Sequence, residues 1–152
     1  MRQEKLIGSV VLVLLVASFS ILAPGCVNEN EVLNESGVEW LTSYDGALNL
    51  SRESGKPVMI CFWAVWCSAC EKYSHETFSD PVVVKTLEEG FIIPLTIDVD
   101  NDQDGIASMY GVRSIPTTLI VDSDGNVLNR WVGSVPPDML IPILHNVSAM
   151  ET

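Results

Sequence analysis

The sequence predicts an α/β fold: a three-layer sandwich in which a mixed central sheet carries helices on both faces. Strand-like apolar runs alternate along the chain with segments that suit helices. Residues 57–63 are almost wholly apolar, as expected of a strand that is buried on both faces of a sheet. Near the C-terminus, two strand-like runs flank Asp124-Gly125, which is a strong signal for a hairpin.

The N-terminal part of the fold is predicted as a strand, a helix and a strand. Residues 38–40 form a short first strand or a segment that leads into the domain. Residues 43–54 form a helix that ends at Gly55, and Pro57 prevents it from continuing. Residues 58–63 then form the central strand.

Two helices and another buried strand follow. The first helix is predicted at about residues 68–77. Asp80 and Pro81 suit the N-cap and the first helical position of the next helix, which extends to about residue 89. Residues 91–98 are apolar and form the third strand of the predicted order.

The C-terminal part supplies the remaining elements. Residues 102–110 form a short helix that ends at Gly111, and residues 117–121 and 127–131 form the hairpin. Residues 137–147 form the closing helix. The resulting order, β-α-β-α-β-α-β-β-α, gives the mixed sheet and the two helical layers.

Two cysteines, Cys67 and Cys70, lie three residues apart where the central strand is followed by a helix. A thiol at a helix N-terminus faces unpaired backbone N–H groups and the positive end of the helix dipole, and both favour its thiolate. The spacing brings the second sulfur within one helical turn of the first, close enough to form a small disulfide. A dithiol that exchanges a disulfide with another protein requires these properties.

Around these cysteines the sequence resembles proteins of the thioredoxin fold. It is most similar to the thioredoxin-like C-terminal domain of bacterial transmembrane thiol:disulfide interchange reductases. The similarity covers about residues 38–146, with the matching segments in the family's order. These segments are Gly55-Lys56-Pro57-Val58-Met59, Phe62-Trp63-Ala64-Val65-Trp66-Cys67-Ser68-Ala69-Cys70, Thr77-Phe78-Ser79-Asp80-Pro81, Gly111-Val112-Arg113-Ser114-Ile115-Pro116-Thr117 and Asp122-Ser123-Asp124-Gly125.

The resemblance implies a thiol:disulfide oxidoreductase that requires no cofactor. Cys67 would be the exposed nucleophile, and Cys70 would resolve the mixed disulfide. Trp66 would form a flat wall beside the nucleophilic sulfur. Ile115 and Pro116 would face the dithiol, joined by a cis peptide bond, and would help to bind an extended segment of the substrate.

Two positions differ from the family's pattern. Cys61, six residues before Cys67, stands where the family usually has a buried carboxylate, and Ser74, four residues after Cys70, stands where the interchange reductases tend to carry a glutamate. Those carboxylates are thought to help remove the proton from the resolving thiol, so the rate and pH dependence of exchange stay open. Cys61 itself is expected to be a buried, inert thiol in the central strand.

The sequence predicts no metal site. The cysteine pair could supply half of a zinc site, but His75 and His145 are isolated and no second Cys/His pair is present. Residues 100–105 match the first half of a calcium-binding EF-hand loop, but the twelfth position is Gly111 instead of glutamate. The aspartates of this run are expected to cap the helix that follows.

The N-terminus predicts export and a membrane tether. Residues 1–26 resemble an export signal, because basic residues precede an uncharged apolar run at residues 6–23. Small residues before Cys26 resemble a lipoprotein signal, in which the cysteine carries the lipid; an uncleaved signal anchor is the alternative. Residues 27–37 form a flexible acidic tether, and residues 38–152 form the thioredoxin-like domain. The folded domain is therefore expected in the cell envelope, on the outer side of the cytoplasmic membrane.

The charge of the chain limits its partners. Its net charge of −12 argues against binding to nucleic acid or to an anionic lipid surface. The resemblance implies exported disulfide-containing proteins and a membrane-embedded electron donor as partners, with the membrane contacted through the N-terminal anchor. Two other functions stay open: a redox-inert binding module of the cell envelope that uses the same fold, and a copper- or zinc-handling lipoprotein.

Overall fold

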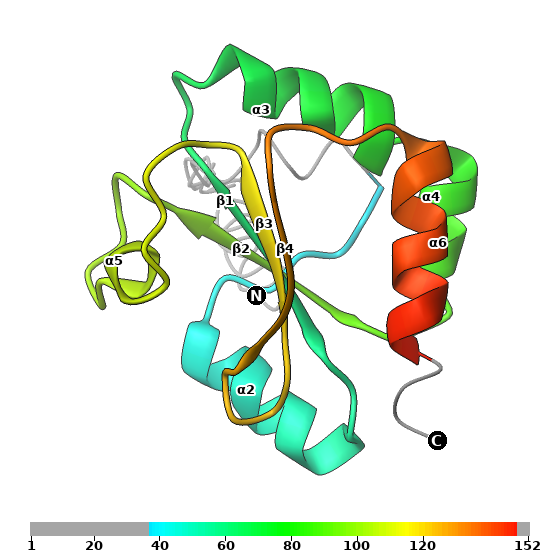
Figure 1. Ribbon diagram of the computed structural model, residues 1–152, viewed down its shortest axis with the longest axis horizontal. Coiled ribbons are helices and arrows are strands. Elements are labelled where there is room, and N and C mark those ends of the chain that lie inside the picture. The colour runs from blue at the N-terminus through cyan, green and yellow to red at the C-terminus, as the bar shows by residue number, and fades with distance from the viewer. Residues whose placement is uncertain (1–36, 149–152) are drawn as a thin grey trace, which may run out of the picture.

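A four-stranded mixed sheet forms the centre of the part of the chain that the structure, a computed structural model, describes, residues 37–148. The strands lie in the order β2-β1-β3-β4 (Figure 1). β1 is parallel to β2 and antiparallel to β3, and β3 is antiparallel to β4. Their bounds are β1 Val58–Trp63, β2 Ile93–Asp98, β3 Thr117–Val121 and β4 Val127–Val132. This mixed sheet confirms the predicted fold class.

Helices cover both faces of the sheet, so the molecule has three layers (Figure 1). Side chains alternate between the two faces along each strand. Met59 and Cys61 of β1 pack toward α3, η1, α4 and α6, whereas Ile60 and Phe62 pack toward α2 and α5. The helices are α2 Tyr44–Ser54, α3 Ser68–Tyr73, η1 Ser74–Phe78 (a π-helical turn), α4 Pro81–Glu88, α5 Ile106–Met109 and α6 Pro137–Ser148.

Side chains and glycines at the helix ends explain several of these boundaries. The hydroxyl of Ser43 accepts a hydrogen bond from the backbone N–H of Gly46, and Gly55 ends α2 in the left-handed conformation at φ 72°. The Asp80 carboxylate accepts from two N–H groups in the first turn of α4. The Asp102 carboxylate accepts from the N–H groups of the first two residues of α5, as the sequence predicted for this acidic run.

The predicted hairpin joins β3 to β4. The Asp122 carboxylate accepts hydrogen bonds from the backbone N–H groups of Asp124 and Asn126 and from the Asn126 side chain. The hydrogen bond from the Asn126 side chain is the main cause of the lowered pKa of Asp122. Gly125 has φ 83°, a conformation that favours glycine. The turn therefore holds the register between the two strands.

Three predicted elements differ in the structure. The strand expected at residues 38–40 is replaced by a single parallel bridge between Leu41 and Leu95, because the chain turns into α2 directly afterwards. The helix expected at residues 68–77 is α-helical only to Tyr73 and continues as η1. The helix expected at residues 102–110 is shorter, because Asp102 caps it from four residues before its first residue.

The predicted export signal, Cys26 and nearly all of the tether lie outside the described residues. Between residues 37 and 148, no helix is both long and apolar enough to cross a membrane.

Candidate functional site

A disulfide joins Cys67 and Cys70 at the start of α3, with 5.2 Å between their Cα atoms. Cys67 is the N-cap of this helix and has extended backbone geometry, with φ −87° and ψ 93°. The backbone N–H of Cys70 points at the Cys67 sulfur, with 3.1 Å between N and Sγ. Hydrogen bonds to a charged acceptor are stronger than those to a neutral one, so this N–H favours the Cys67 thiolate once the disulfide is reduced.

Both sulfur-bearing residues are largely covered. Cys67 is 7% exposed and Cys70 is 2% exposed. The prediction of an exposed Cys67 is therefore wrong, although Cys67 is the more exposed of the two. They share a cluster with Trp63 and Ala64, against which Trp40, Val99 and Ile115 pack, and these apolar neighbours explain the burial.

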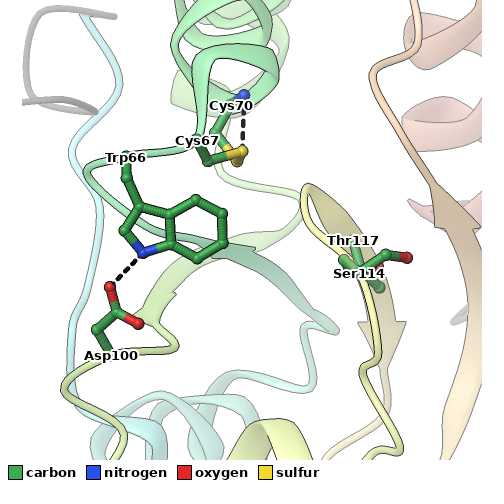
Figure 2. The surroundings of a disulfide bond; sticks show 6 residues. All are labelled: Trp66, Cys67, Cys70, Asp100, Ser114 and Thr117. Atoms are coloured by element: carbon green, nitrogen blue, oxygen red, sulfur yellow. Dashed lines mark hydrogen bonds between the residues drawn. A yellow bond between two sulfur atoms is a disulfide. The ribbon is translucent and has the colours of Figure 1, made fainter.

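Trp66 stands out from the surface immediately before the disulfide, with 67% of its area exposed. Its indole N–H donates a hydrogen bond to the Asp100 carboxylate, with 2.6 Å between Nε1 and Oδ2. Figure 2 shows the indole between the disulfide and Asp100, which follows the end of β2. This bond holds an exposed aromatic surface beside the sulfur atoms.

The loop before β3 lies on another side of the disulfide. The Ile115–Pro116 peptide bond is cis, as the resemblance implied, and Ile115 packs against the cluster that contains both cysteines. Pro116 is buried. The Thr117 hydroxyl donates a hydrogen bond to the carbonyl oxygen of Ser114, with 2.7 Å between the two oxygen atoms, and this bond closes the loop (Figure 2). Trp66 and Ile115, which are far apart in the sequence, thus both border the disulfide.

Cys61 lies in the central strand and is buried, as predicted. Burial raises the pKa of its thiol to about 12, while Thr118, its partner in the β1–β3 pair, lowers it to a smaller extent. The nearby Tyr73 hydroxyl accepts a hydrogen bond from the Trp131 indole N–H over 3.1 Å, and burial raises its pKa as well. The position at which the family usually has a buried carboxylate therefore holds a neutral thiol at neutral pH.

Ser74, the second departure from the family's pattern, is buried at the start of η1. Its backbone N–H bonds to the carbonyl oxygens of Cys70 and Glu71, so it continues the active-site helix. Thr77 in the same turn donates to the Val135 carbonyl oxygen over 2.7 Å. These bonds join the helix of the cysteine pair to the segment before α6.

Comparisons with known proteins agree with this geometry. The thioredoxin-like domain family matches residues 44–148. The chain belongs to this family. It is 36% identical over 89 residues to the thiol:disulfide interchange protein DsbD of Citrobacter koseri, a match that covers 57% of this chain and 16% of that protein.

Solved structures support the same fold. A thioredoxin from Thermus thermophilus superimposes with a TM-score of 0.63 and 28% identity, over 73% of this chain and 87% of that one. The oxidised C-terminal domain of Neisseria meningitidis DsbD gives a TM-score of 0.59 at 23% identity, over 72% of this chain and 99% of that one, and this match shows the fold alone. The chain thus combines a Cys67–Cys70 disulfide with a thioredoxin-like domain that is homologous to thiol:disulfide interchange proteins.

The role of Asp100 in the thioredoxin-like site was missed from the sequence. It lies 34 residues after Trp66 within a run of aspartates, where capping of a helix explained it equally well. No local pattern links the two positions. Only the parallel pairing of β1 with β2, which brings the ends of both strands to one edge of the sheet, places them together.

We expect the Cys61 thiol to resist alkylation in the folded, oxidised protein. Its thiol is buried, and with a pKa of about 12 it forms very little of the reactive thiolate at mildly alkaline pH. Iodoacetamide should modify Cys61 rapidly after unfolding in urea and very slowly before it, as measured by mass spectrometry of the peptide that contains it. Equal modification in both states would contradict this burial.

Proposed function

We propose that the chain is a membrane-tethered disulfide reductase that acts outside the cytoplasm on other proteins. The observation that supports it most is the Cys67–Cys70 disulfide at the start of α3, bordered by the exposed Trp66 and by the loop of Ile115 and Pro116. A pair that closes a loop of so few residues contributes little to stability, so a purely structural role is a poor explanation of it.

In the proposed reaction, the reduced protein transfers two electrons to its substrate. The Cys67 thiolate attacks one sulfur of a substrate disulfide, and the other substrate sulfur leaves as a thiolate that takes up a proton. Cys70 then loses its proton, and its thiolate attacks Cys67 in the mixed disulfide. The substrate is released as a dithiol, and the Cys67–Cys70 disulfide forms again.

The surroundings of the disulfide suggest the roles of the neighbouring residues. Cys67 serves as the nucleophile because it is the more exposed cysteine and receives the Cys70 N–H. Trp66 and Ile115 supply apolar surface on which a substrate segment packs beside the sulfur atoms, and Pro116 fixes the loop that carries Ile115.

The oxidised pair must be reduced before the next cycle. We propose a membrane-embedded donor for these two electrons, by analogy with the thiol:disulfide interchange proteins that the chain resembles. The matched region corresponds to only 14–18% of the length of the DsbD relatives compared.

Reduction of insulin by dithiothreitol, with and without the full-length protein, tests the proposal. An active dithiol should accelerate the precipitation of the insulin B chain well above the rate with dithiothreitol alone. No acceleration, in a preparation whose circular dichroism shows a folded domain, would favour the redox-inert binding module instead.

The proposed tether is tested separately. If Cys26 carries the lipid, replacing it with alanine should move most of the protein from the membrane fraction to the soluble fraction. Immunoblots of fractionated cells, with and without an alkaline carbonate wash, measure this change. A Cys26→Ala protein that stays as firmly bound as the parent would support the uncleaved signal anchor at residues 1–26.

A further inference from the structure

A cleft of about 330 Å³ opens beside the end of the central strand. The segment that enters α2 forms one side, and the loop between β2 and α5 forms another. Trp63 of β1 and Thr96 of β2 also line it. This volume lies at the lower end of the range of pockets that bind small groups, and it suits about one extended residue with its side chain.

The cleft is strongly acidic. Its lining includes the four aspartates Asp45, Asp98, Asp102 and Asp104, and no lysine or arginine is among the lining residues. Two of these carboxylates have structural partners: Asp98 accepts from the backbone N–H of Asp100 and from the Asn101 side chain, and Asp102 caps α5. Structure-forming bonds therefore explain part of the cluster, but no cationic side chain of the lining offsets its negative charge.

Two residues of the same lining carry buried polar atoms. The indole N–H of Trp63 and the hydroxyl of Thr96 have no hydrogen-bond partner within the described protein. Both residues are more than nine-tenths buried. A buried donor without a partner costs free energy, so these two atoms favour a bound group that offers them an acceptor.

One residue of the lining, Trp63, connects the cleft to the cysteine pair. Trp63 packs in the same cluster as Cys67 and Cys70. On the other side, the Asp98 carboxylate holds the backbone of Asp100, whose own carboxylate holds the Trp66 indole. Figure 2 shows Asp100 and Trp66 in contact beside the cysteine pair. Trp63 and the chain of hydrogen bonds through Asp98 and Asp100 thus connect the cleft with the residues around the disulfide.

We propose that this cleft binds a lysine or arginine residue of the partner polypeptide, close in space to the disulfide that is exchanged. The cationic side chain pairs with the carboxylates, and a backbone carbonyl oxygen accepts from the Trp63 indole N–H. The inference rests on the proposed reductase function and defines its substrates as disulfides with basic neighbours. A metal ion is a poor occupant, since no three histidine, cysteine or acidic side chains in residues 37–148 are grouped to hold one.

Single-turnover reduction of two synthetic peptides tests the proposal. Both carry the same intramolecular disulfide, flanked in one by lysines and in the other by serines. The reduced full-length protein in detergent should react faster with the lysine peptide by about fivefold, the equivalent of two weak ion pairs. About 0.5 M salt should remove most of this preference.

Two double variants test whether the preference for the lysine peptide arises from the cleft. Asp45→Asn combined with Asp104→Asn should reduce the ratio of the two rate constants toward one. Glu53→Gln combined with Glu88→Gln removes the same charge at the C-terminal ends of α2 and α4, so this pair should leave the ratio as it is. Equal losses in both double variants would mean a general effect of net charge and would overturn the proposal.

A third variant separates binding from a structural role. Thr96→Val keeps the shape of the side chain and removes a hydroxyl that has no partner in the described protein. The melting temperature should not fall, and the preference for the lysine peptide should decrease. A lower melting temperature with an unchanged preference would overturn the role of Thr96. Equal rates for both peptides with the parent protein would exclude the basic subsite, whereas no reduction of either peptide would exclude the reductase function itself.

Discussion

Replacing Cys67 with serine is expected to lower disulfide reduction by a factor on the order of a thousand or more, to the rate of the reductant alone. A serine hydroxyl forms almost no anion near neutral pH, so the Cys70 N–H beside this position has no thiolate to stabilise. The remaining Cys70 is only 2% exposed and cannot replace it as the attacking group. Insulin reduction by the purified variant measures the loss.

The matching change at the second cysteine should give a different result. In Cys70→Ser the nucleophile is intact, so the first step proceeds and the mixed disulfide between Cys67 and the substrate accumulates. A covalent adduct that disappears on addition of dithiothreitol should be visible on non-reducing gels. Cys67→Ser should form no such adduct.

Cys61→Ala is the control for these two variants. It removes a thiol that is buried in the central strand and lies outside the disulfide, so most of the activity should persist if the variant is folded. A Cys67→Ser protein with near-normal turnover, or a Cys61→Ala protein that is folded but inactive, would show that the assignment of the nucleophile is wrong.

The sequence predicts the site best where local rules act. The position of β1 follows from the continuous apolar run that precedes the cysteine motif. The end of α2 follows from Gly55, the start of α4 follows from the capping side chain of Asp80, and the hairpin follows from the turn that contains Gly125. These signals depend on residues within a few positions of one another, so one sequence is enough to find them.

The remaining features depend on contacts between distant segments. The burial of Cys67 arises from Trp40, Val99 and Ile115, which approach it only in the folded chain. The expected first strand fails for a related reason, since only Leu41 pairs with β2 before the chain turns into α2. The acidic cleft combines α2, two strands and a loop. No periodicity in the sequence reports such arrangements.

The second large effect is expected for the stability of the layer that carries the cysteine pair. Phe78 ends the π-helical turn and is fully buried. Its ring lies 4.9 Å from that of Trp40, nearly perpendicular to it, and 4.5 Å from that of Tyr73. Phe78→Ala should lower the free energy of unfolding by about 3–5 kcal/mol, because it removes a large apolar side chain and leaves a cavity.

Urea titration followed by tryptophan fluorescence measures this loss as a lower midpoint at an unchanged slope. Phe91→Ala is the matched control, because this phenylalanine is 48% exposed and should cost about 1 kcal/mol or less. Equal shifts for both variants would contradict the packing described for Phe78.

Since a domain of this size is stable by only about 5–15 kcal/mol, the Phe78 variant should lose a large part of its stability. The short loop closed by Cys67 and Cys70 constrains the unfolded chain too little to offset that loss. The variant should therefore have a lowered free energy of unfolding in both the oxidised and the reduced states.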